Sequence, residues 1–194
     1  MRVFLAVPPD PEWSDGARAL SDRLRAVLPR AAWTRPESWH LTLAFLGEIA
    51  SEAAEQFAAR MEETFTEAAG GELAAAGAIT FPPRGRPRVA GIGFRPGAMA
   101  DELERLAGAG AAAARALGLP ASGRDFHPHV TLARIRDPWP RAAVDAFRRE
   151  ADAWRFPTWR VRACVLYRSR LDPGGAVHSP LREWALPAPA EIRA

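Results

Sequence analysis

The chain has 194 residues, of which 48% are apolar and 25% are charged, a balance typical of a folded domain and too apolar for a disordered chain. Its formal charge is only +3, and all 26 of its basic residues are arginine. The absence of lysine excludes a phosphate-loop ATPase, a Schiff-base enzyme and a ligase that adenylylates its own lysine, because each of these needs a lysine amine.

The composition also argues against a membrane or disulfide-rich protein. No uncharged apolar run reaches the roughly 18 residues that a membrane span needs, and the apolar opening Met1–Val7 is too short for a signal peptide. The single cysteine, Cys164, can form no internal disulfide and no cysteine-rich metal site. Its apolar neighbours predict that it is buried. We therefore expect a cytoplasmic protein that does not contact a membrane.

The first half of the chain alternates predicted strands and helices, recognised by apolar periods of two and of about 3.6 residues. In chain order we expect a strand at Arg2–Val7, a helix at 11–27 capped by Asp10, a strand at Trp39–Leu46, and a helix capped by Ser51 and ended by Gly70-Gly71.

The second half is predicted to contain more strands than helices. We expect strands at Glu72–Phe81 and Arg88–Phe94 joined by the turn Pro82–Pro87, a helix at Asp101–Leu117, a strand at His129–Arg134, a helix at Arg141–Ala151, and strands at Thr158–Leu171 and Val177–Leu186 around the turn Asp172–Gly175. Several strands alternate polar and apolar residues, which favours antiparallel pairing. The predicted class is α+β.

One short pattern occurs twice. Trp39-His40-Leu41-Thr42-Leu43 and Pro128-His129-Val130-Thr131-Leu132 both contain His-x-Thr-Leu with an apolar residue at x, and the two histidines lie 89 residues apart. Each copy lies on a predicted strand that follows a helix-containing stretch. The repeat predicts an internal duplication within a single domain that spans residues 1–194.

Strand geometry gives this pattern a chemical meaning. Side chains at i and i+2 point to the same face, so each histidine projects together with its threonine, and Trp39 projects away. Two imidazoles on a shared face can act as acid and base in one displacement, because histidine exchanges protons at neutral pH. Threonine hydroxyls and an arginine suit phosphate oxygens, and Arg134 is the nearest arginine to Thr131.

These segments resemble the two-histidine phosphoesterases, specifically the LigT-like RNA 2′,3′-cyclic phosphodiesterases once described as 2′-5′ RNA ligases. The likeness spans nearly the whole chain. The residues that carry it are Arg2-Val3-Phe4-Leu5-Ala6, Trp39–Gly47, Phe126–Arg134, and Ser169-Arg170-Leu171 with Gly174-Gly175. Two correctly spaced and flanked His-x-Thr motifs are far more specific than one.

The resemblance implies two pseudo-symmetric lobes, each with a mainly antiparallel sheet and flanking helices, and an active-site cleft between them. It implies opening of a 2′,3′-cyclic phosphate at an RNA 3′ end, tRNA fragments among the substrates, to leave a 2′-phosphate. It further implies reversible 2′-5′ ligation by a monomer that needs no ATP, no cofactor and no metal. By motif, His40 would be the proton donor, His129 the proton acceptor, and Thr42, Thr131 and Arg134 the phosphate-binding residues.

Some features permit other interpretations. His127 and His129 form a His-x-His pattern near Asp125, so a metal site is conceivable, although a rim position for His127 fits the pattern better. Gly91-Ile92-Gly93 lacks the context of a nucleotide-binding fingerprint and indicates a bulge or close packing in a strand. His178 stands where relatives often carry tyrosine, which leaves its role open.

Charge is unevenly spread along the chain. Residues 48–72 have a net charge of −6 and residues 124–170 a net charge of +6, and four more arginines gather at positions 84, 86, 88 and 95. This distribution permits a rival function, an arginine-rich RNA-binding module without turnover. A second alternative keeps the chemistry but acts on a small cyclic nucleotide, since the reacting ring is the same.

Overall fold

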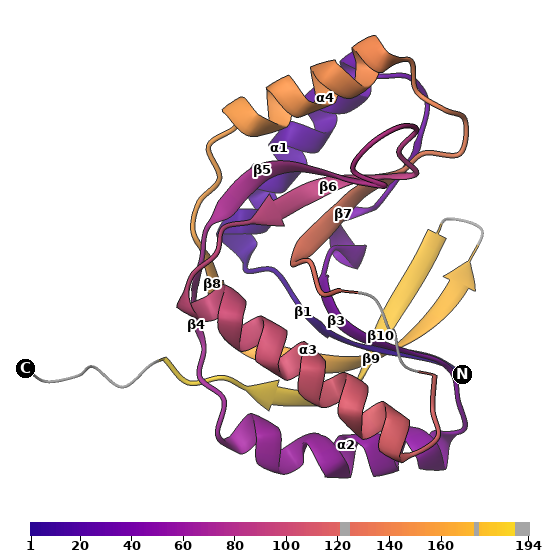
Figure 1. Ribbon diagram of the computed structural model, residues 1–194, viewed down its shortest axis with the longest axis vertical. Helices are drawn as coiled ribbons and strands as arrows, with labels where there is room; N and C mark the ends of the chain where they lie inside the picture. Colours follow the sequence, from indigo (N-terminus) through magenta and orange to yellow (C-terminus); the bar gives the residue numbers. More distant parts are fainter. Residues whose placement is uncertain (121–124, 173–174, 189–194) are drawn as a thin grey trace, which may run out of the picture.

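The computed structural model describes residues 1–120, 125–172 and 175–188 (Figure 1). Within these ranges it contains four α-helices, one 3₁₀ helix and ten strands. Every strand pair is antiparallel. The predicted α+β class is therefore confirmed.

The elements follow the predicted order, with additional short ones. The strands are β1 (Arg2–Val7), β2 (Ala32–Trp33), β3 (Leu41–Glu48), β4 (Gly71–Leu73), β5 (Ala75–Phe81), β6 (Val89–Phe94), β7 (His129–Arg134), β8 (Trp159–Val161), β9 (Ala163–Asp172) and β10 (Gly175–Ala185). The helices are α1 (Pro11–Val27), η1 (Pro36–Ser38), α2 (Ser51–Thr66), α3 (Ala98–Ala116) and α4 (Arg141–Ala153).

Eight strands form one sheet whose two halves meet at a single residue pair. The order is β10-β9-β1-β3-β7-β6-β5, and β2 also pairs with β7. Between the central strands β3 and β7, Leu41 pairs with Val130. Strands β4 and β8 form a separate two-stranded sheet. The two histidine motifs therefore begin on adjacent strands, one in each half of the sheet.

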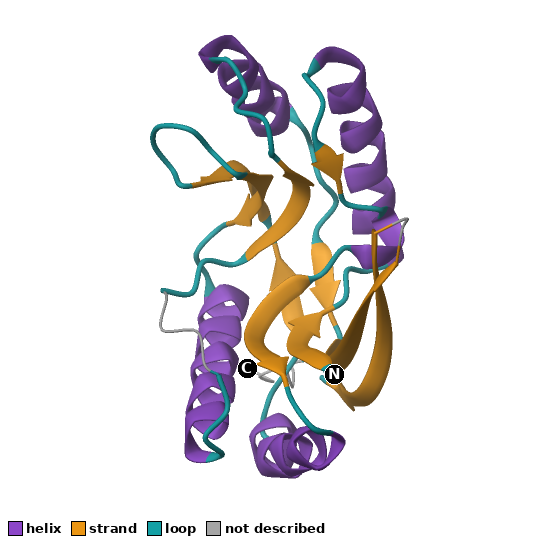
Figure 2. Ribbon diagram, turned by 90° about the vertical axis from the view of Figure 1, so that its right-hand side faces the viewer, coloured by secondary structure: helices purple, strands orange, loops and turns teal. Residues whose placement is uncertain are grey.

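Two helices accompany each half of the sheet. Helix α4 packs on β5 and contacts α1, whereas α3 packs on β3 and contacts α2 (Figure 1). In the side view of Figure 2 the strands run through the middle of the molecule and the helices lie along its outer sides. The largest fully buried side chains include Trp13, Phe57, Phe147 and Trp159. Burying an aliphatic or phenyl side chain of this kind contributes roughly 1.5–3 kcal/mol.

Helix starts show where local signals succeed and where they fail. Asp10 caps α1 as predicted, because its Oδ1 accepts a hydrogen bond of 2.8 Å from the Trp13 amide. The predicted cap of α2 is wrong by one residue. Ala50 occupies the N-cap position, and Ser51 is already helical. Helix α3 begins at Ala98, three residues before the predicted start.

The predicted strands are confirmed with shifted ends. Segment 72–81 is divided into β4 and β5, segment 158–171 is divided into β8 and β9, and β3 begins at Leu41 rather than Trp39. The side chains of Trp39 and Cys164 are buried as expected. The tip of the predicted turn at 172–175 falls outside the described residues. No helix in the described ranges is long and apolar enough to cross a membrane.

Candidate active site

The β3–β7 pairing brings the two His-x-Thr motifs together. Leu41 and Val130, the x residues of the two motifs, are direct partners and fully buried. Continuing this antiparallel register by one residue in each direction puts His40 opposite Thr131 and Thr42 opposite His129. The two histidines are then diagonal neighbours, which in a regular antiparallel pair lie about 7–8 Å apart, their Cβ atoms somewhat closer. This separation leaves room for a phosphate group between the rings.

The leucine that ends each motif lies at a β-bulge. In the β1–β3 register Leu5 pairs with Ala44 and Ala6 with Thr42, so Leu43 is skipped. In the β6–β7 register Ala90 pairs with Ala133 and Gly91 with Thr131, so Leu132 is skipped in the same way. Because the extra residue shifts the alternation of side chains by one, Arg134 comes to the histidine face although it lies three residues after Thr131. Phe45 takes the equivalent position on β3 and is 51% exposed.

Gly91 permits the bulge in β7. A Cβ atom at this position would collide with the carbonyl oxygen of Val130, so a larger residue would push β6 away from β7. The prediction that this glycine marks a bulge or close packing is confirmed.

Both histidine rings are held by a backbone carbonyl two residues earlier. Nδ1 of His40 lies 2.8 Å from the oxygen of Ser38, and Nδ1 of His129 lies 2.7 Å from the oxygen of His127. A carbonyl oxygen can only accept, so in each ring Nδ1 carries the proton and donates it. Nε2 of each neutral ring is therefore left with a lone pair that can take a proton from, or when protonated give one to, a substrate.

Burial lowers the pKa of His40 from 6.5 to about 4. The hydrogen bond to Ser38 opposes this shift, and the charges of His178, Arg134 and His129 add to it. The pKa of His129 is lowered too, first by burial and then by the charges of His127 and Arg134, against the hydrogen bond to the His127 backbone. The positive charge of Arg134 contributes to the lowering at both rings.

Each histidine packs against a phenylalanine from its own half. The ring centroids of His40 and Phe4 are 4.7 Å apart, and those of His129 and Phe81 are also 4.7 Å apart. These apolar walls contribute to the desolvation that lowers both pKa values. On the His40 side a second imidazole, that of His178, packs edge to face against the His40 ring, with the ring centroids 5.1 Å apart.

The three phosphate-binding candidates have side chains that solvent can reach. The side chains of Thr42 and Thr131 are partly exposed, and Arg134 is exposed. In the described part of the chain neither threonine hydroxyl has a protein hydrogen-bond partner and Arg134 forms no ion pair. All three are therefore available to an anion on the histidine face.

Ser38 connects His40 to the β9–β10 hairpin. Its carbonyl accepts from His40, and its hydroxyl donates a 2.8 Å hydrogen bond to the carbonyl of Ala176. Arg35 reaches the same carbonyl at 3.4 Å. Ser38 is buried, so these contacts fix the strand segment that carries His178 relative to His40.

The sequence of the chain matches a known protein family. The family model for LigT-like phosphoesterases matches the chain in two segments, residues 7–90 and 93–178. The chain belongs to this family. Among curated proteins, the RNA 2′,3′-cyclic phosphodiesterase of Archaeoglobus fulgidus is 31% identical, over 94% of this chain and 98% of that protein. The Thermus thermophilus protein of the same name is 32% identical, over 96% and 90% of the two chains.

Solved structures agree with this assignment. A crystal structure of a Thermus thermophilus protein superimposes with a TM-score of 0.74 and 29% identity, covering 97% of this chain and 99% of the other. LigT of Escherichia coli in its apo form superimposes with a TM-score of 0.71 and 25% identity, covering 96% and 97%. The resemblance drawn from the two motifs is confirmed.

The alternative interpretation of this LigT-like phosphoesterase was a metal site at His127 and His129. Among the described residues, no group of three or more His, Cys, Asp or Glu side chains is arranged to hold a metal ion. His127 is exposed. Its backbone carbonyl, rather than its imidazole, contacts His129. The rim position predicted for His127 agrees with this exposure.

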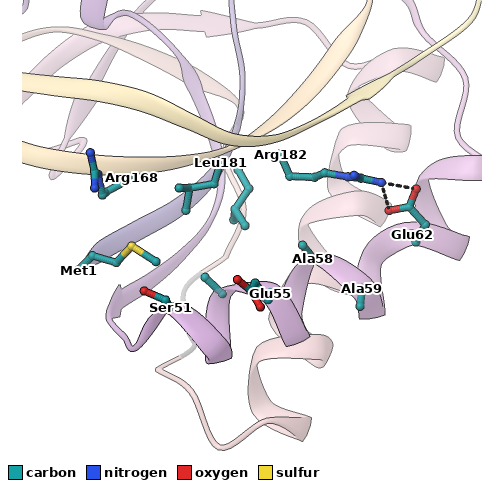
Figure 3. Close-up of a pocket in the computed structure, with 11 residues that line it drawn as sticks. Met1, Ser51, Glu55, Ala58, Ala59, Glu62, Arg168, Leu181 and Arg182 are labelled. Carbon is teal, nitrogen blue, oxygen red and sulfur yellow. Dashed lines mark hydrogen bonds and ion pairs between the residues drawn. The ribbon is translucent and has the colours of Figure 1, made fainter.

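A cavity of about 740 Å³ lies away from the motif histidines, between α2 and the β9–β10 hairpin (Figure 3). Glu62 on its wall binds Arg182 at 3.0 Å and accepts from the Trp184 indole. These hydrogen bonds, Trp184 first, lower the pKa of Glu62. No motif residue lines this cavity, so it is not part of the candidate active site.

Sequence patterns missed Ser38, Phe4, Phe81 and the backbone of His127 as parts of the site. The carbonyl contacts depend on the backbone and leave no mark on residue type. Phe81 reaches His129 from another strand, so its role depends on strand pairing. Phe4 lies in a segment that supported the family resemblance, but its contact with His40 depends on the pairing of β1 with β3.

Proposed function

We propose that this chain hydrolyses a 2′,3′-cyclic phosphate at the 3′ end of RNA, with His40 as the acid and His129 as the base. The observation that carries the proposal is the matched arrangement of the two rings. Both motifs begin on adjacent strands, and both rings donate Nδ1–H to the carbonyl two residues earlier. The names of the relatives give the substrate class.

In the proposed reaction Nε2 of His129 takes a proton from water, and the resulting hydroxide oxygen bonds to phosphorus. The bond from phosphorus to the 3′ oxygen breaks, and Nε2–H of protonated His40 gives its proton to that oxygen. The product carries a 2′-phosphate. His40 ends neutral and His129 protonated, and proton exchange with solvent restores both.

Thr42, Thr131 and Arg134 are proposed to bind the non-bridging phosphate oxygens. Their hydroxyl and guanidinium donors stabilise charge that develops on these oxygens in the transition state. The bound anion also raises the pKa of His40 above its value of about 4 in the free site, because an opposite charge favours the protonated imidazole. Substrate binding therefore prepares the acid.

The protein's own imidazoles supply both proton transfers, so the proposed hydrolysis consumes no ATP and uses no cofactor. One copy of the chain carries all five side chains, so a monomer suffices. Reversal of the same step, with a 5′-hydroxyl in place of water, would form a 2′-5′ linkage. Cytoplasmic RNA is the substrate pool that this proposal implies.

An internal duplication is proposed as the origin of the two half-sites. The family model matches two segments of similar length, and each contains one His-x-Thr-Leu motif. The two leucine bulges and the two carbonyl contacts are equivalent as well. Superposition of the two halves of an experimental structure, with His40 on His129, tests this inference.

The direct test uses an RNA oligonucleotide that ends in a 2′,3′-cyclic phosphate. His40→Ala and His129→Ala should each abolish hydrolysis, and His127→Ala should not, because it keeps the carbonyl that orients His129. The product of the wild type should carry its phosphate on the 2′ oxygen. Activity should persist in excess EDTA. Full activity of His40→Ala, or loss of activity in EDTA that zinc restores, would reject the two-histidine mechanism.

A further inference from the structure

An exposed, arginine-rich loop lies beside the His129 half of the site. The loop, residues 82–88 between β5 and β6, carries arginine at every second position, Arg84, Arg86 and Arg88, and contains no acidic residue. All three side chains are exposed. We call these three residues together with Arg136, which is also exposed, the arginine track. The acidic residue closest in sequence to any of the four is Asp137, which follows Arg136.

The loop is held in place at both ends. The Arg88 amide donates a 2.7 Å hydrogen bond to the Phe81 carbonyl, and Arg148 donates to the carbonyl of Pro83 at 3.0 Å. Pro82, Pro83 and Pro87 restrict the backbone. The backbone of such a loop loses little conformational entropy when it binds a ligand. The backbone positions of its arginines are therefore fixed before a partner binds.

Two contacts fix the track relative to the site. Phe81, the residue before the loop, packs on the His129 ring at 4.7 Å. The Ile135 amide donates a 2.8 Å hydrogen bond to the Arg88 carbonyl, so the far end of the loop borders the segment that carries Arg134 and Arg136. Figure 1 shows the loop next to the end of β7. The track thus leads away from the histidines on the β7 side.

The track arginines differ from several other exposed arginines in their lack of carboxylate partners among the described residues. Arg105, Arg170 and Arg182, also exposed, bind Glu102, Asp172 and Glu62. Among the described residues none of the four track arginines forms an ion pair. Arginine binds phosphate through two parallel N–H donors. Unpaired guanidinium groups in a row therefore fit a chain of phosphodiesters better than a single small anion.

We propose that the arginine track binds the phosphodiester backbone of the nucleotides that precede the reacting RNA end, so that the preferred substrate is a strand and not a cyclic mononucleotide. The inference rests on the proposed function for the reacting end and adds the residues that bind the RNA strand upstream of it. It assigns Arg134 to the reacting phosphate and the track to the phosphates upstream of it.

The test compares wild type with Arg84→Gln/Arg86→Gln/Arg88→Gln. A remote triple variant, Arg18→Gln/Arg60→Gln/Arg115→Gln on helices α1, α2 and α3, changes the net charge equally and is the matched control. Kinetics with an RNA oligonucleotide ending in a cyclic phosphate and with a 2′,3′-cyclic mononucleotide give the ratio of the two kcat/KM values. Fluorescence anisotropy with a labelled oligonucleotide measures binding at several salt concentrations.

The loop variant should lower the oligonucleotide-to-mononucleotide ratio about tenfold, roughly twofold for each of the three exposed charges removed. Each phosphate contact of a single strand adds about 0.7 to the salt exponent, so a fourfold rise in salt should weaken wild-type binding about 20 times more than binding by the loop variant. The remote variant should retain the wild-type exponent, and Arg84→Lys/Arg86→Lys/Arg88→Lys should retain most of it.

If the loop variant has the wild-type ratio of kcat/KM values and the wild-type salt exponent, the proposal that the arginine track binds RNA is wrong. It is also wrong if the remote variant loses as much of the ratio and of the exponent as the loop variant does. Hydrolysis would then still support the proposed function. If wild type hydrolyses neither substrate, the proposed function fails. The anisotropy exponents, which need no turnover, still decide whether the track binds RNA.

Discussion

Acidification should weaken the fold through His40, and the size of the effect follows from its burial. Its pKa is lowered to about 4 in the folded chain, against 6.5 as the ordinary value. His40 therefore binds a proton more tightly in the unfolded state than in the folded state. The free energy of unfolding keeps its full value above pH 6.5 and decreases as the pH falls towards 4. Between about pH 7 and about pH 5 the loss reaches roughly 2 kcal/mol.

The measurement is urea unfolding of wild type and His40→Asn at both pH values. His129 and His178, whose pKa values are also lowered, remain in the variant, so the difference between the two proteins reports His40. Partial access of water to the ring makes 2 kcal/mol an upper limit. The matched control is His127→Asn, which removes an exposed imidazole. Equal pH dependence in wild type and His40→Asn would refute the claim that burial keeps His40 neutral.

Three further predictions concern the same site. Because a bound anion should raise the pKa of His40, the alkaline limb of kcat should lie at higher pH than that of kcat/KM, which pH–rate profiles measure. Thr42→Val and Thr131→Val should each lower kcat/KM about tenfold to a hundredfold, with Ser in place of Thr restoring activity if the hydroxyl is what binds phosphate. Ser38→Ala keeps the carbonyl that orients His40 but loses the hydroxyl bond to Ala176, so urea unfolding should show a loss of about 1 kcal/mol while hydrolysis continues.

The face proposed to be catalytic was predictable because its pattern is local. Alternation along a strand already places His40 with Thr42 and His129 with Thr131, and it sends Trp39 into the core, where the structure has it. The α+β class and most elements follow from periods and caps of the same local kind. Asp10 shows this well, since its carboxylate caps the helix that its position predicts.

The remaining features depend on contacts between distant segments. No local pattern states that β3 lies next to β7, because that pairing depends on the whole order of the sheet. Leu43 and Leu132 look like ordinary alternating strand residues, and they become bulges only through the registers of β1 and β6. The position of Arg134 on the histidine face follows from that bulge. Sequence proximity to Thr131 selected the same arginine without supplying this geometric reason.

The two half-sites share one backbone design but differ in their neighbours, and this difference accounts for the separate roles proposed for them. At equivalent positions after the bulges stand Arg134 on β7 and Phe45 on β3, so a fixed positive charge comes from one half only. Burial holds His40 strongly towards its neutral form. In the proposed mechanism the charge of a bound phosphate raises the pKa so that His40 takes up a proton from solvent, and the buried ring then gives that proton readily to the leaving oxygen. A duplicated motif alone would make the two imidazoles interchangeable. In the proposed mechanism their different surroundings favour His40 as the proton donor and His129 as the base.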